Sequence, residues 1–213
     1  MKKRAEAPEI PADPVRRAVL GALIGFPAVG LVGYAARSLT AAGTAFELPP
    51  TLACGDDDDA NPTPSQTEGP YFTPNSPERS SLLERGASGS RLIVSGRVLS
   101  TFCDPIAGAL LDFWQADADG EYDNRGYRFR GHQYTDGEGR FSLETVVPGL
   151  YTGRTRHIHV KVQGRGGRVL TTQLYFPDEP RNARDGIYSP KLLMAVAGEG
   201  GAQHGSFNFV LRA

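Results

Sequence analysis

Cysteine is scarce in this 213-residue chain, which contains only Cys54 and Cys103. Two cysteines so far apart cannot form a Cys-x-x-Cys motif or the cysteine framework of a zinc finger. They could form one disulfide if the chain is exported, because disulfides persist in oxidising compartments. The cysteine content therefore excludes cysteine-based metal and redox motifs and leaves a single cross-link open.

An excess of charge of one sign is also missing. The chain has 23 basic and 24 acidic residues, which gives a formal net charge of −1. Proteins that bind nucleic acid or acidic membrane surfaces by electrostatic attraction carry clustered positive charge. We therefore expect no nucleic-acid partner.

Helical periodicity is absent after about residue 40, and there is no internal repeat. The 26 glycines and 16 prolines instead punctuate short runs of β-branched and aromatic residues, a pattern typical of strands separated by turns. Residues 131–140 have the turn chemistry of a hairpin. The sequence predicts an all-β fold, an antiparallel β-sandwich with long loops at one rim. The expected strands are residues 91–99, 109–116, 141–147, 170–176 and 206–211, with one more that carries His157 and His159.

One long hydrophobic run is present, at residues 18–36, and it contains no charged residue. The adjacent Arg16 and Arg17 precede it, as in a twin-arginine export signal. The run is also just long enough for a retained membrane anchor. A third interpretation is lipid attachment at Cys54, which follows a degraded lipobox. We expect an exported protein, periplasmic or extracellular, with membrane attachment through the N-terminal segment left open.

Composition divides the chain into three parts. Residues 1–45 are expected to be the export signal or anchor. Residues 46–63, which contain an acidic block and several prolines, are predicted to be a flexible linker. Residues 64–213 are predicted to form the folded domain, and the sequence does not determine its oligomeric state.

His157 and His159 lie in a valine-rich run that is predicted to be a strand. Side chains two residues apart on a strand point to the same face, about 6.6 Å apart along the backbone. Two imidazoles in this arrangement can bind one metal ion. By itself the pair suits zinc, copper, nickel or iron, and it also occurs on solvated edge strands.

Two tyrosines lie at bends beside this strand in the expected fold: Tyr122 follows Asp-Gly-Glu, and Tyr151 follows Pro-Gly-Leu. A phenol with a pKa near 10 ionises at neutral pH only beside a strong Lewis acid. Two tyrosinates and two imidazoles would therefore favour ferric iron over copper or zinc.

Four segments of the chain resemble the intradiol ring-cleavage dioxygenases, the group that includes protocatechuate 3,4-dioxygenase and catechol 1,2-dioxygenase. The resemblance covers most of the folded part, in the family's order. The segments are TEGPYF at 67–72, CDPIAGALLDFWQADADGEYD at 103–123, YRFRGHQYTDGEGRFSLETVVPGLYTGRTRHIHVKV at 127–162 and LTTQLYF at 170–176.

The resemblance implies an enzyme with non-haem Fe(III) as cofactor, and an aromatic diol and O₂ as substrates. The ring would open between its two hydroxyl-bearing carbons to give a muconate-type dicarboxylate. Tyr151 would leave the metal when the diol binds and accept one of its protons. Arg154 and Gln173 would line the pocket and complete the catalytic set. The implied metal ligands are Tyr122, Tyr151, His157 and His159.

The chain also departs from this family. It lacks the N-terminal helical region of the catechol 1,2-dioxygenases, and the stretch from Tyr151 to His157 is short. A more open pocket is expected, so the diol is not identified. Two alternatives stay open, because fold does not determine function. One is an exported β-sandwich binding module that has lost the chemistry, and the other is a copper or zinc protein.

Overall fold

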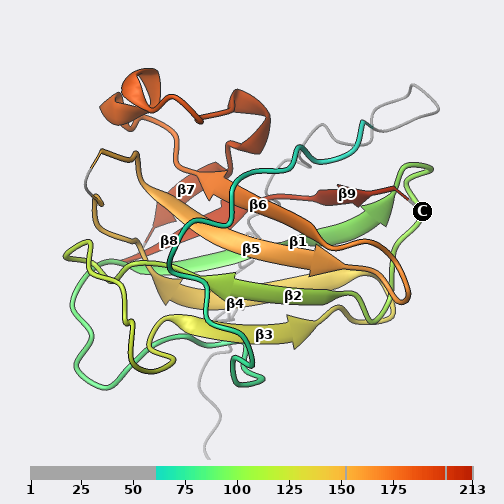
Figure 1. Cartoon of the computed structure of the whole chain (residues 1–213), viewed down its shortest axis with the longest axis horizontal. Coiled ribbons are helices and arrows are strands. Elements are labelled where there is room, and N and C mark those ends of the chain that lie inside the picture. The colour runs from blue at the N-terminus through green and yellow to red at the C-terminus, as the bar shows by residue number, and fades with distance from the viewer. Residues whose placement is uncertain (1–60, 152, 200, 213) are drawn as a thin grey trace, which may run out of the picture. The chain divides into compact units, whose positions relative to one another are not determined.

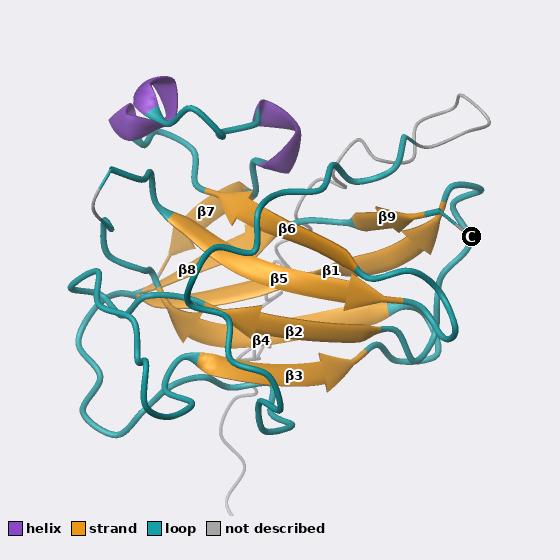
Figure 2. Ribbon diagram, in the orientation of Figure 1, coloured by secondary structure: helices purple, strands orange, loops and turns teal. Residues whose placement is uncertain are grey.

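The structure is a computed structural model that describes residues 61–151, 153–199 and 201–212. These residues form strands joined by loops, with two short 3₁₀ helices, η2 (Pro180–Arg184) and η3 (Pro190–Leu192) (Figure 2). The strands are β1 (Arg91–Ser100), β2 (Leu110–Trp114), β3 (Arg130–Tyr134), β4 (Arg140–Val146), β5 (His157–Gln163), β6 (Leu170–Tyr175), β7 (Ala195–Glu199), β8 (Ala202–Ser206) and β9 (Phe209–Leu211).

The strands form two sheets that make a sandwich (Figure 1). One sheet has the order β4-β1-β8-β7, with β9 also paired to β1, and the other has the order β3-β2-β5-β6. Buried side chains of both sheets, such as Leu92, Phe113 and Val160, belong to one apolar core. The predicted β-sandwich is confirmed.

The sequence predicted antiparallel pairing throughout, but the structure also contains parallel pairs. β1 pairs in parallel with β8 and with β9. Parallel neighbours need a long crossover connection, and here the chain passes through the second sheet before its C-terminal strands return to β1. The sequence pattern contains no signal for this long-range pairing.

The hairpin predicted at residues 131–140 is wrong. β3 pairs with β2 and β4 pairs with β1, so the turn between them carries the chain from one sheet to the other. The turn itself forms, because the Asp136 carboxylate accepts from the backbone N–H groups of Glu138 and Arg140 at 2.9 and 2.8 Å. Turn chemistry therefore marks the bend without determining which sheet each flanking strand joins.

Strand β5 has one apolar and one polar face. Ile158 and Val160 are fully buried in the core of the sandwich. Because side chains alternate along a strand, His157, His159 and Lys161 lie on the opposite, outer face of the four-stranded sheet. The two histidines are therefore outside the apolar core and need a separate cover.

That cover is an extended segment at residues 61–80, which we call the strap. It crosses the outer face of the four-stranded sheet (Figure 1). Its Gln66 N–H donates to the Thr171 carbonyl of β6 at 2.8 Å, and its Arg79 N–H donates to the His132 carbonyl of β3 at 2.8 Å. Bonds to both edges of the sheet hold the strap over β2 and β5.

The predicted export segment, residues 1–45, lies outside the described residues, as does the predicted linker up to residue 60. Cys54 is among them, whereas Cys103 is described and is not a free thiol. Within residues 61–212, the described parts include no helix long and apolar enough to span a membrane.

Candidate metal centre

His157 and His159 meet at their Nε2 atoms. These atoms are 3.1 Å apart, and the two residues are 4% and 3% exposed. The Nδ1–H of His157 donates to the Thr155 carbonyl at 2.6 Å, which leaves the lone pair on Nε2 directed at its neighbour. Hydrogen bonding at one ring nitrogen is how proteins orient the other toward a metal.

Both imidazoles are uncharged at neutral pH. Burial lowers the pKa of His157 to about 4. Burial, reinforced by the neighbouring His157, lowers the pKa of His159 well below its ordinary value. Neutral imidazole is the form that binds metals, so the pair is available as ligands without losing a proton.

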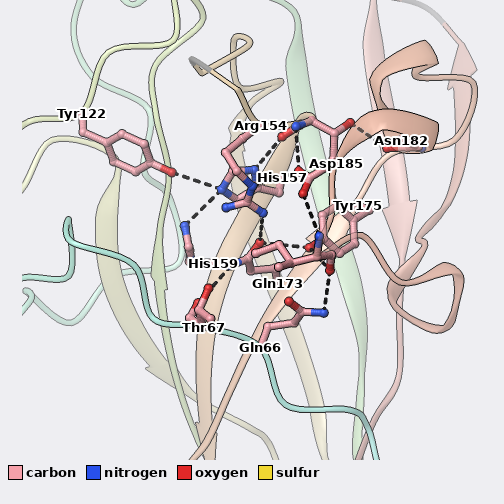
Figure 3. Close-up of polar contacts among 12 residues, drawn as sticks. Gln66, Thr67, Tyr122, Arg154, His157, His159, Gln173, Tyr175, Asn182 and Asp185 are labelled. Atoms are coloured by element: carbon pink, nitrogen blue, oxygen red, sulfur yellow. Dashed lines mark hydrogen bonds and ion pairs between the residues drawn. The ribbon is translucent and has the colours of Figure 1, made fainter.

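Tyr122 approaches the histidines from the loop between β2 and β3. Its Oη lies 3.5 Å from the His157 Nε2 (Figure 3). Its ring stacks on the Tyr71 ring of the strap, with centroids 4.4 Å apart. The loop is anchored by buried Arg130, which donates to the Asp123 carbonyl at 2.7 Å and to the Tyr71 carbonyl at 2.6 Å. One guanidinium thus ties the Tyr122 loop to the strap.

Tyr151 lies on the connection between β4 and β5. Its ring is edge-on to that of Tyr122, with centroids 5.7 Å apart, and its Oη is hydrogen-bonded to the Tyr71 Oη at 2.8 Å. Tyr71 belongs to the strap, in the segment TEGPYF. The structure gives it a close relation to the site, because it contacts both candidate tyrosine ligands.

Two glycines allow the tyrosine loops to approach each other. A Cβ added to Gly120 would lie 2.4 Å from the Leu150 carbonyl oxygen, and one added to Gly149 would lie 2.3 Å from the Gly120 nitrogen. Such distances are far inside van der Waals contact. Glycine is therefore required where the segments leading to Tyr122 and Tyr151 cross.

We expect Gly149→Ala to lower the free energy of unfolding by about 1–3 kcal/mol, as overpacking does, and to weaken metal retention by separating the two loops. Gly137→Ala is the matched control, because nothing lies within 4 Å of a Cβ there. Urea unfolding followed by circular dichroism measures the first effect and metal analysis the second. Equal stability of the two variants would contradict the close-approach argument.

The donor atoms fit a ferric ion. Two nitrogen atoms 3.1 Å apart are spaced as adjacent ligands of one ion with bonds of about 2.1 Å. Among the described residues, no group of three or more His, Cys, Asp or Glu side chains is arranged to hold a metal ion, so tyrosines would have to complete the set. Burial raises the pKa of Tyr122, which means that its ionisation needs a highly charged cation nearby.

Arg154 and Gln173 lie beside the histidines and are hydrogen-bonded to each other. The Arg154 Nη2 donates to the Gln173 Oε1 at 2.6 Å, and the Gln173 Nε2 donates to the Thr67 carbonyl of the strap at 2.9 Å (Figure 3). Tyr175 donates to the same Gln173 oxygen at 3.1 Å. Tyr175 lies two residues after Gln173 on β6, so the two side chains share one face of the sheet.

Trp114 packs against His159. Its indole stacks on the His159 ring at 4.7 Å between centroids, and Phe72 of the strap contacts the indole edge-on at 4.9 Å. The Nδ1 of His159 and the Nε1 of Trp114 are buried without a hydrogen-bond partner. Aromatic packing therefore fixes the orientation of the His159 ring, whereas a hydrogen bond fixes that of the His157 ring.

A family model described as Dioxygenase matches residues 67–213. The chain is 30% identical to the chlorocatechol 1,2-dioxygenase of Pseudomonas sp. (strain P51), with 68% of each protein covered. It is 35% identical to the protocatechuate 3,4-dioxygenase beta chain of Burkholderia cepacia, over 47% of this chain and 50% of that one. The chain thus spans 68% and 50% of the length of these two curated relatives.

A solved structure gives the same assignment. It is the dioxygenase domain of a dioxygenase carbohydrate-binding protein fusion from the cellulolytic bacterium Streptomyces sp. SirexAA-E. The identity is 57% and the TM-score 0.70, with 71% of this chain and 99% of that chain covered. Members of the family typically use non-haem Fe(III) and act on aromatic diols with O₂. Sequence motifs, fold and comparisons agree that the chain belongs to the intradiol ring-cleavage dioxygenase family.

Proposed function

We propose that the protein is an Fe(III)-dependent intradiol dioxygenase that acts on a catechol-type aromatic diol. Both atoms of O₂ would enter the product, and the carbon–carbon bond between the two hydroxyl-bearing carbons would break. Each of these carbons becomes a carboxyl carbon, so the product is a muconate-type dicarboxylate. O₂ is the only co-reactant, and no external reductant is needed.

One observation carries this proposal. Four side chains from three separate segments, Tyr122, Tyr151, His157 and His159, converge on the outer face of the four-stranded sheet under the strap. An incidental group of aromatic residues would not also have two neutral imidazoles whose Nε2 atoms are 3.1 Å apart. Ferric iron, when bound there, would supply the Lewis acidity that favours the diol dianion and its activation.

Tyr151 is the proposed base for the diol. As a phenolate it would accept a proton from one diol hydroxyl, which is ordinary general-base catalysis by a positioned side chain. The Tyr71 hydroxyl, 2.8 Å from the Tyr151 Oη, is placed to hydrogen-bond that oxygen both before and after proton transfer. Tyr122, stacked on Tyr71, is held in place and would stay a ligand.

Arg154 is the proposed electrostatic partner of the substrate. Its guanidinium is next to the two histidines and bonds to Gln173, so it can stabilise negative charge that develops on the ring and its oxygens. Gln173 is held by the strap carbonyl of Thr67 and can orient the diol. His157 and His159 are only 4% and 3% exposed on the face that the strap crosses.

The test is a visible absorption spectrum of the purified, iron-loaded protein, before and after anaerobic addition of catechol. Tyrosinate bound to Fe(III) should give a red-brown charge-transfer band that shifts when catechol binds. Tyr122→Phe and Tyr151→Phe should each weaken or remove the band. Tyr134→Phe, an exposed tyrosine on β3, is the control and should leave it intact.

Two outcomes would contradict the proposal. A colourless protein that binds stoichiometric copper or zinc and ignores catechol would favour the alternative metal centre. A protein that binds none of these metals would favour a sandwich used only for binding.

We further propose that the N-terminal segment directs export. The support is the Arg16-Arg17 pair before the apolar run and the absence of a free thiol at Cys103. Fractionation of cells that express the full chain, with N-terminal sequencing of the protein, tests it. Protein found only in the cytosol with its first residues intact would refute it.

A further inference from the structure

We propose that Asp185 is a positioning residue that orients Arg154 at the candidate site. Asp185 follows η2 in the segment after β6, outside every motif that indicated the function. The catalytic consequence of this inference rests on the proposed function, whereas the orientation of Arg154 can be tested without it.

The Asp185 carboxylate accepts three hydrogen bonds, two from the segment that precedes β5 and one from its own loop. Its Oδ2 accepts from the Arg154 Nε at 2.8 Å and from the Thr155 N–H at 2.9 Å, and its Oδ1 accepts from the Ile187 N–H at 3.1 Å (Figure 3). The side chain is only 3% exposed. Three hydrogen bonds and burial hold this carboxylate in one orientation, so the carboxylate also holds its donors in place.

The consequence reaches the pocket through Arg154. The guanidinium uses its Nε on Asp185, and its Nη2 therefore points to the Gln173 Oε1 at 2.6 Å. A planar guanidinium held at one edge has a defined direction for its remaining N–H groups. Asp185 thus determines which N–H groups of Arg154 face the substrate.

A second arginine in the same stretch provides a matched comparison. Arg156 pairs with Glu179 at 3.3 Å, and Glu179 is the N-cap of η2. The two arginines lie on either side of Thr155, and one short segment supplies a carboxylate to each. Of these two ion pairs, the Arg154–Asp185 pair is the one hydrogen-bonded to Gln173. Comparing variants of the two carboxylates therefore separates the positioning of Arg154 from general stabilisation of the segment.

An amide cannot replace the Asp185 carboxylate. Both of its oxygens accept from N–H donors, whereas asparagine has one acceptor and one donor group. In Asp185→Asn, an amide oxygen that keeps the Arg154 and Thr155 contacts sets its NH₂ group against the Ile187 N–H, and it lacks the negative charge that strengthens the bond to the guanidinium. We expect the guanidinium to turn away and to lose its bond to Gln173.

Crystal structures of the iron-loaded wild-type protein and of the Asp185→Asn and Glu179→Gln variants test the orientation. Arg154 should keep its bond to Gln173 in Glu179→Gln and lose it in Asp185→Asn. Arg154 unchanged in Asp185→Asn would overturn the inference. The charge-transfer band should persist in Asp185→Asn. Loss of the metal in this variant would also overturn the inference, because Asp185 would then act on the metal ligands rather than on Arg154.

The catalytic consequence is tested by ring-cleavage kinetics with catechol. We expect kcat/KM to fall about 100-fold in Asp185→Asn, the size of effect that a misplacement of about 1 Å has, and to change less than about twofold in Glu179→Gln. Arg154→Lys keeps the charge and removes the Nε contact. In that background, Asp185→Asn should add little, because the two residues act through one interaction.

Fully additive losses in this cycle would show that Asp185 does not act through Arg154, and would overturn the inference. A wild-type protein with neither the iron band nor ring cleavage would instead refute the proposed function and the catalytic consequence. The crystal structures would still decide whether Asp185 orients Arg154, so the two failures are distinguishable.

Discussion

Replacing either His157 or His159 with asparagine is expected to abolish iron retention and ring cleavage together. Each residue contributes a buried, neutral imidazole whose Nε2 faces that of the other at 3.1 Å. Even residues behind a metal ligand change metal affinity about 10–100-fold when replaced. We therefore expect the loss of a direct ligand to lower iron affinity by more than about 100-fold, measured by competition with a chelator.

The control for this prediction is His204→Asn, which replaces an exposed histidine of β8 and should change neither iron content nor activity. Circular dichroism must show that the His157 and His159 variants remain folded. If folded variants of both retained one iron per chain, the histidines could not be the ligands, and the candidate metal centre would have to be placed elsewhere.

Tyr151→Phe is expected to have the second-largest effect, through proton transfer. A positioned general base typically contributes about 10²–10⁴-fold to a rate. We therefore expect kcat for catechol to fall within that range while iron stays bound through the other ligands. Stopped-flow kinetics under single-turnover conditions, with iron content measured on the same samples, would separate slower proton transfer from loss of iron.

Tyr71→Phe gives a graded comparison, because it removes only the hydroxyl that is 2.8 Å from the Tyr151 Oη. It should cost about 1 kcal/mol, or several-fold in rate, the usual size of one hydrogen bond. Tyr134→Phe, an exposed tyrosine, should change nothing. A Tyr71→Phe loss as large as that of Tyr151→Phe would mean that Tyr71, rather than Tyr151, is the base.

The predictions that the structure confirms depend on local patterns. β1, β2, β4 and β6 were expected from short β-branched and aromatic runs, and each begins and ends within two residues of the expected range. β5 forms where a strand carrying His157 and His159 was expected. The same local rule places His157 and His159 on one face of β5. A period of two residues requires no knowledge of what packs nearby, which is why the sequence was sufficient here.

The errors concern pairings between distant segments. The turn at Asp136 was identified, but β3 and β4 joined different sheets. The parallel pairing of β1 with β8 and β9 was also missed. Which strands pair depends on how two sheets bury a common core, and hydrophobic alternation is the same for either partner.

By itself, the sequence determined the family, the two-sheet class and the residue types of a candidate ferric site. These follow from local periodicity and from motifs in a fixed order. Only the tertiary structure decided what holds that site in place: Tyr71 between the two tyrosines, Arg130 tying the strap to the Tyr122 loop, and Asp185 behind Arg154. Their roles arise from contacts between segments far apart in the chain. The buried Arg130 has no local signature, because its partners are backbone carbonyls that every sequence contains. Asp185 has none either, because Arg154 and Thr155 lie 31 and 30 residues away in the chain.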